Sequence, residues 1–105
     1  MTAPRLPRTK PQLDLAKAAA LFAVPARAEI LLVLEARGEV SAGELAALAG
    51  VSASTASSHL AHLLDRGLLA VDQRGRSRVY RLAGEQVRSA LESLRLLAAL
   101  SSRER

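Results

Sequence analysis

The sequence predicts a mainly α-helical fold that carries one small β-hairpin. Five segments have helical spacing of apolar residues or helix-boundary signals, and two short segments flank an Arg-Gly-Arg turn. Half of the 105 residues are hydrophobic but only 2% are aromatic, so the core must be built from Leu, Ala and Val, which favours helices. A chain of this length holds one small domain with a thin core, and a partner subunit would add buried surface.

The N-terminal part of the chain predicts an extended arm followed by two helices. Residues 1–11 interleave three basic residues with three prolines, a composition that builds no core, so we expect a flexible basic arm. Residues 12–23 carry apolar positions at helical spacing and predict the first helix. Pro25 suits the first turn of a second helix, which continues to Gly38.

Two short helices separated by a tight turn are predicted next. Ser41 followed by Glu44 has the form of a capping box and opens a third helix, which Gly50 ends. Ser52 can cap a fourth helix that runs to about Arg66. The short connection between the third and fourth helices is typical of a helix-turn-helix.

A hairpin and a fifth helix complete the chain. Residues 68–73 and 77–82 flank the turn at 74–76 and predict two antiparallel strands. Residues 84–100 return to helical spacing, and residues 101–105 are expected to form a frayed tail. The predicted order is α-α-α-α-β-β-α, with one domain over residues 12–100.

The fourth helix has an apolar face opposite a face of small polar residues. On a helical wheel the apolar residues fall within about a third of the circle, and that face is expected to be buried. They are Ala56, Leu60, Leu63 and Leu64. Short hydroxyls on the other side let a helix backbone approach DNA closely and bond to base edges and phosphates. The alternative is capping by Ser52, with the remaining serines as solvated surface.

The hairpin concentrates positive charge. Between Asp72 and Arg81 lie four arginines against one aspartate, a net charge of +3, and the whole chain carries +5. A basic hairpin after a recognition helix suits contacts to phosphates or to the adjacent minor groove. We call this hairpin, over residues 68–82, the wing; the alternative interpretation is a solvated turn.

These segments together resemble a known family. LFAVPARAEILLVL, followed by GEVSAGELAALAGVSASTASSHLAHLLDRGLLAVDQRGRSRVYRL, is similar to the ArsR/SmtB family of winged helix-turn-helix transcriptional regulators, over about residues 13–100. The resemblance implies a homodimer joined through its first and last helices, with one recognition helix for each half of a partly palindromic operator. The strong apolar character of these two helices supports the dimer independently; the alternative is that both pack only within the monomer.

The predicted site residues fall into two sets. The expected DNA contacts are Ser41, Ser54, Thr55, Ser57, Ser58, His62, Arg74, Arg76 and Arg78. The expected dimer interface contains Leu13, Leu21, Val87, Leu91, Leu94 and Ala98. Ala53 and Ser58 stand where relatives often have longer side chains, so direct base readout is expected to be modest and shape readout larger.

No cofactor is expected, and no metal site of the kind usual in the family. The chain has no cysteine, which excludes disulfides and thiolate ligands, and its last helix offers Glu85 and Glu92 but no histidine. His59 and His62 are weak candidates for zinc or nickel if Asp65 joined them. The effector stays open: a metal held by nitrogen and oxygen ligands in the dimer, a small apolar molecule, a partner protein, or none.

The predicted function is sequence-specific binding of double-stranded DNA by a transcriptional regulator, with repression favoured. The alternatives are a metal-responsive regulator, an activator, and a winged-helix module for protein contacts. Catalysis is not expected, because the serines and histidines lack a third orienting group. No apolar run approaches the length of a membrane span and the first residues do not form a secretory signal, so we expect a cytoplasmic protein with no membrane contact.

Overall fold

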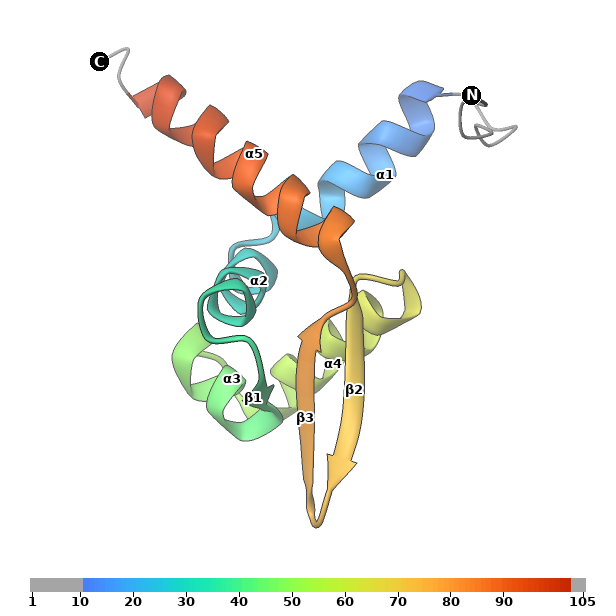
Figure 1. Ribbon diagram of the computed structural model, residues 1–105, viewed down its shortest axis with the longest axis vertical. Coiled ribbons are helices and arrows are strands. Elements are labelled where there is room, and N and C mark those ends of the chain that lie inside the picture. The colour runs from blue at the N-terminus through green and yellow to red at the C-terminus, as the bar shows by residue number, and fades with distance from the viewer. Residues whose placement is uncertain (1–10, 103–105) are drawn as a thin grey trace.

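The computed structural model describes residues 11–102, with side chains from residue 15 onward, and has five helices and three strands in that range (Figure 1). The helices are α1 (Pro11–Ala23), α2 (Pro25–Arg37), α3 (Ala42–Ala49), α4 (Ala53–Asp65) and α5 (Glu85–Ser102). The strands are β1 (Val40–Ser41), β2 (Leu69–Arg74) and β3 (Ser77–Leu82). The predicted element order is confirmed, with β1 added. None of the helices in the described range is long and apolar enough to cross a membrane.

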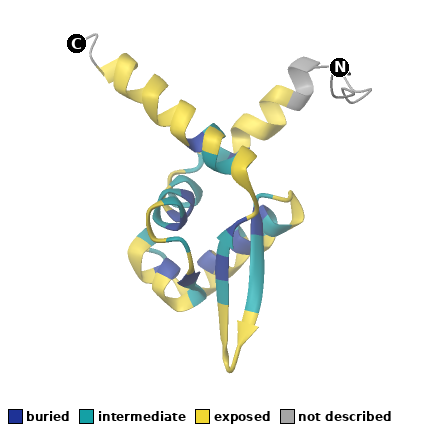
Figure 2. Cartoon of the chain, viewed as in Figure 1, coloured by how far each residue is buried: buried dark blue, intermediate teal, exposed yellow. Residues whose placement is uncertain are grey.

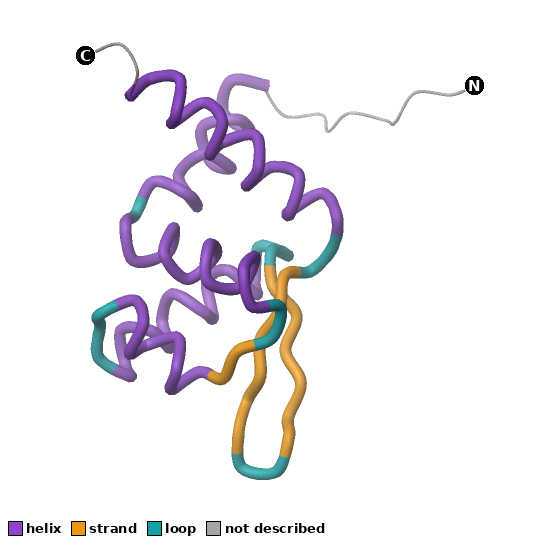
Figure 3. The backbone as a smooth tube through the Cα atoms, turned by 60° about the vertical axis from the view of Figure 1, so that its left-hand side comes forward, coloured by secondary structure: helices purple, strands orange, loops and turns teal. Residues whose placement is uncertain are grey.

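The strands form an antiparallel sheet in the order β1-β3-β2. The prediction contained only the β2–β3 hairpin, because β1 is two residues long and has no periodicity to recognise. β1 pairs with β3 through Val40 opposite Tyr80 and Ser41 opposite Val79. The hairpin continues beyond this pairing as a two-stranded ribbon, which projects from the body of the molecule (Figure 3).

The core is built around α2, whose Ile30, Leu31 and Leu34 are fully buried. α1, α3, α5 and the sheet pack around this helix. The apolar face predicted for α4 is confirmed: Leu60 and Leu63 are fully buried against the same core. Aliphatic side chains therefore supply almost the whole interior, as the scarcity of aromatic residues required.

Side-chain caps set the starts of α3 and α4. The Ser41 hydroxyl accepts a hydrogen bond from the Glu44 backbone N–H at 3.3 Å, and Ser52 accepts one from Thr55 at 3.1 Å. Both predicted caps are confirmed. The capping box is only half formed, however, because the Glu44 carboxylate pairs with Arg37 at 2.9 Å.

The ends of α1 and α5 diverge from the body and are largely exposed (Figures 1 and 2). α5 continues to Ser102, so Ser101 and Ser102 are helical and not part of a frayed tail. Residues 103–105 of that predicted tail lie outside the described residues. The predicted arm lies outside them too, except Pro11, which begins α1.

The structure changes the interpretation of the predicted interface. Leu21 and Leu91 lie in the monomer's own core, at 8% and 4% exposure, because the inner ends of α1 and α5 pack onto α2. Val87 is half-buried beside that core, whereas Leu94 and Ala98 are exposed farther along α5. The side chain of Leu13 lies outside the described residues. The apolar residues of α1 and α5 therefore fall into two groups. Those at the inner ends of the helices lie in the core, and those farther out are exposed.

Candidate DNA-binding surface

The candidate surface consists of the N-terminal half of α4 and the wing. The wing points away from the free ends of α1 and α5, and α4 begins beside α3 (Figure 1). Gly50 allows the tight turn between these helices because it adopts the left-handed backbone conformation, with φ 70° and ψ 33°. Ala56 and Leu60 anchor the buried side of α4, so the opposite side of its first turns is held outward.

The hydroxyl residues of α4 do not all have the same role. Ser54, Ser57 and Ser58 are exposed and free of the cap, as a contact surface requires. Thr55 is exposed too, but its hydroxyl accepts a hydrogen bond from Ser52 at 3.0 Å, so it belongs to the cap. His62 is half-buried and lies one turn beyond Ser58 on the same side of the helix.

The start of α3 and the wing enclose a shallow pocket of about 350 Å³. It is lined by Ser41, Ala42, Gly43, Arg76, Ser77 and Arg78. The positive end of a helix and two guanidinium groups both favour an anion such as a phosphate. The pocket brings Ser41 together with the wing residues, although Arg76 lies 35 positions farther along the chain. Sequence reasoning missed Ala42 and Gly43, whose only signal is their small size after the cap.

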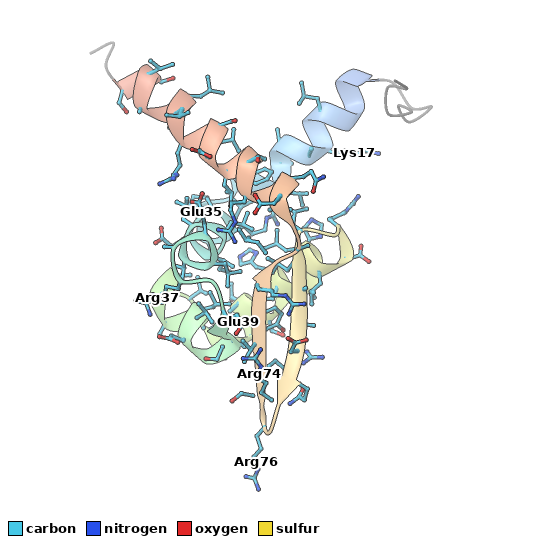
Figure 4. All side chains as sticks on the ribbon, in the orientation of Figure 1. Lys17, Glu35, Arg37, Glu39, Arg74 and Arg76 are labelled. Carbon is cyan, nitrogen blue, oxygen red and sulfur yellow. The ribbon has the colours of Figure 1, made fainter. Side chains whose placement is uncertain are left out.

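The four arginines of the wing fall into two groups, which differ in whether a carboxylate lies beside the guanidinium. Arg74 makes two hydrogen bonds of 3.0 Å to the Glu39 carboxylate, and Arg81 lies 2.8 Å from Asp72. Hydrogen bonding to Glu39, and then its negative charge, raise the pKa of Arg74 above its ordinary value. Arg76 and Arg78 make no ion pair with any residue in the described range, and Figure 4 shows Arg76 extending beyond the tip.

The two histidines of α4 do not form a metal site in one protomer. His59 and His62 are half-buried, and neither ring makes a hydrogen bond to another described residue. Among the side chains of residues 15–102, no three of His, Asp and Glu come close enough to hold an ion together. Asp65 therefore does not complete the weak candidate site.

Comparison with known proteins identifies the family. A family profile described as a helix-turn-helix domain matches residues 22–72. The HTH-type transcriptional regulator YgaV of Escherichia coli (strain K12) is 35% identical over 71 residues, which cover 68% of this chain and 72% of YgaV. The solution structure of the homodimeric winged helix-turn-helix DNA-binding domain of Mb0332 from Mycobacterium bovis, a possible ArsR-family transcriptional regulator, is 28% identical with a TM-score of 0.80. It covers 99% of this chain and 96% of that domain. This chain belongs to the ArsR/SmtB family.

The matched relatives are transcriptional regulators and not enzymes, so this winged helix-turn-helix domain is that of a DNA-binding transcriptional regulator. The HTH-type transcriptional regulator YdfF of Bacillus subtilis (strain 168) is 42% identical over 81 residues, or 77% of this chain. The chain spans only 36% of the length of YdfF. The similarity to YdfF therefore concerns about a third of that relative.

Proposed function

We propose that this ArsR/SmtB protein binds a partly palindromic operator as a homodimer and acts as a repressor. One α4 enters the major groove of each half-site, and each wing contacts the flanking backbone or minor groove. The observation that carries the proposal is that Arg76 and Arg78, which have no carboxylate partner among the described residues, lie beside the positive end of α3 in one pocket. A dimer on such a site blocks transcription where its operator overlaps a promoter, and it acts in the cytoplasm with the DNA.

The shape of α4 supports close approach to DNA. Ser54, Ser57 and Ser58 add little bulk, so the backbone of the helix can come near the floor of the groove. Short hydroxyls reach few base edges, and neither Ala53 nor Ser58 can form a two-pronged contact to one base. Sequence preference therefore comes from a few hydroxyl contacts together with the shape of the DNA under the wing.

Uncovered apolar surface supports the dimer. Leu15, Leu94 and Leu97 are 71%, 41% and 58% exposed on the diverging helices. A pocket of about 200 Å³ opens between α1, α2 and α5. Its lining is Phe22, Ala28, Leu32, Leu91, Leu94, Arg95 and Ala98. Exposed apolar surface of this kind marks an interface, and a second copy related by a two-fold axis supplies a matching apolar surface.

A salt titration of DNA binding tests the proposal. Replacing Arg76 and Arg78 together with Ala should weaken binding to every duplex and reduce the dependence of log affinity on log salt by about 0.9 for each lost phosphate contact. Arg66→Ala, an exposed arginine at the end of α4, is the charge-matched control for each replacement and should leave that dependence unchanged. Ser57→Ala should instead alter the preference among operator variants. Equal slopes for the double variant and the parent would contradict the proposal.

A further inference from the structure

In the part of the chain that the structure describes, no third strand supports the outer half of the wing. β1 reaches β3 only at Tyr80 and Val79, whereas the ribbon continues through residues 73–78. A two-stranded ribbon in water is marginally stable by itself. Arg76 and Arg78 both lie on this unsupported part, so their direction depends on whatever fixes it to the body.

The Glu39 side chain connects the body to the unsupported ribbon through hydrogen bonds. Glu39, which immediately precedes β1, accepts two parallel hydrogen bonds of 3.0 Å from the guanidinium of Arg74, the last residue of β2 (Figure 4). A two-pronged contact between planar groups fixes direction as well as distance. Asp72 extends the contact, since it lies 3.6 Å from Arg74 and 2.8 Å from Arg81.

The position of this contact determines its effect. Glu39 and Arg74 are about half exposed, so the pair adds little to the stability of the whole protein. The pair joins the connection between α2 and α3 to the last residue of β2, however. The start of α3 also lines the shallow pocket together with the wing. The same contact satisfies the charge of Arg74, which leaves Arg76 and Arg78 as the wing arginines without an acidic partner among the described residues.

We propose that Glu39 is a positioning residue of the DNA-binding surface: by holding Arg74, it fixes the wing so that Arg76 and Arg78 face the DNA. Arg74 is then a brace and not a phosphate contact, in contrast to the prediction from sequence. The inference rests on the proposed function, because the wing must meet DNA for its direction to matter. Two other interpretations make different predictions: Arg74 contacts phosphate itself, or Glu39 only repels DNA.

The first measurement uses the free protein. Hydrogen exchange and ¹⁵N relaxation of the backbone amides at residues 73–78 should show faster motion in Glu39→Gln and in Arg74→Gln. The exchanged pair, Glu39→Arg with Arg74→Glu, should restore the order of the parent. Arg37→Gln is the matched control, because it breaks another exposed pair, with Glu44 at 2.9 Å, away from the wing. Unchanged motion in both single variants would overturn the proposal.

The second measurement uses duplex DNA over a range of salt. Arg74→Gln should bind about two- to fivefold more weakly, the effect of a lost exposed pair, with an unchanged salt slope, and the exchanged pair should recover most of the affinity. A slope reduced by about 0.9 without recovery would show that Arg74 contacts phosphate. Tighter binding by Glu39→Gln would show that Glu39 only repels DNA. Either result overturns the proposal.

The two measurements separate this inference from the proposed function. If the parent protein binds no duplex at low salt, the proposed function fails, and the role of Glu39 toward DNA fails with it. The free-protein measurement would still decide whether Glu39 fixes the wing. If the parent binds DNA but the single variants keep both wing order and affinity, only the inference fails.

Discussion

At the scale of single residues, similar hydroxyl side chains at the start of α4 have different roles that depend on their place in the first turns. Ser52 precedes the helix, and its oxygen accepts from the Thr55 N–H at 3.1 Å. Ser54 and Ser57 lie within the first turns of the helix, take no part in the cap, and are exposed to solvent. The abundance of serine in this segment thus reflects one requirement for folding and a separate, proposed requirement for DNA contact.

Replacing Ser52 with Ala should lower the free energy of unfolding by about 1 kcal/mol, because the first turn of α4 loses its cap. Chemical denaturation of the two variants measures the difference. Ser54→Ala is the matched control, since Ser54 makes no cap, and its effect should stay within about 0.5 kcal/mol. Equal stability of the Ser52 variant and the parent would show that the cap contributes nothing.

At the scale of elements, the sequence correctly predicted those features that local signals determine, such as the ends of helices. Caps and glycines fix helix ends, so the predicted bounds of α2, α3 and α4 agree with the structure to within one or two residues. β1 was missed because a two-residue strand exists only through its partner β3. The brace between Glu39 and Arg74 was missed for the same reason: it joins residues 35 positions apart, and nothing in either local segment indicates the other.

The turn between α3 and α4 allows a paired test with one type of substitution. Gly50→Ala should reduce the free energy of unfolding by about 1–2 kcal/mol, because alanine is strained in the left-handed conformation that Gly50 adopts. Gly43→Ala should increase it by about 0.5 kcal/mol, since Gly43 is helical and has open space around the added methyl group. Thermal or urea unfolding measures both. Effects of the same sign would contradict this account of the turn.

At the scale of the whole molecule, the apolar stripes of α1 and α5 were predictable but their partners were not. A stripe indicates that a helix face is covered, without indicating whether the same chain or another chain covers it. Leu21 and Leu91 pack on α2 in the monomer, whereas Leu94 is 41% exposed only one turn beyond Leu91. Leu94 instead faces the open pocket between α1, α2 and α5, and this division depends on how the helices pack in three dimensions.

Leu94→Glu should separate the proposed dimer, because it places a charge in the apolar surface that two copies would bury together. Light scattering after size-exclusion chromatography should then give the mass of a single chain where the parent gives twice that mass. Leu48→Glu is the control, since Leu48 is exposed to a similar extent, 39%, but lies on α3. A dimeric Leu94 variant would place the interface elsewhere.

The most direct test of the central claim is a footprint of the purified protein on an operator selected from random duplexes. The proposed dimer, with one α4 and one wing for each half-site, predicts two protected major-groove segments whose centres lie about 10 base pairs apart or a multiple of that distance. Flanking protection should disappear when Arg76 and Arg78 are replaced with Ala. Failure to select or protect any duplex at low salt would contradict the claim.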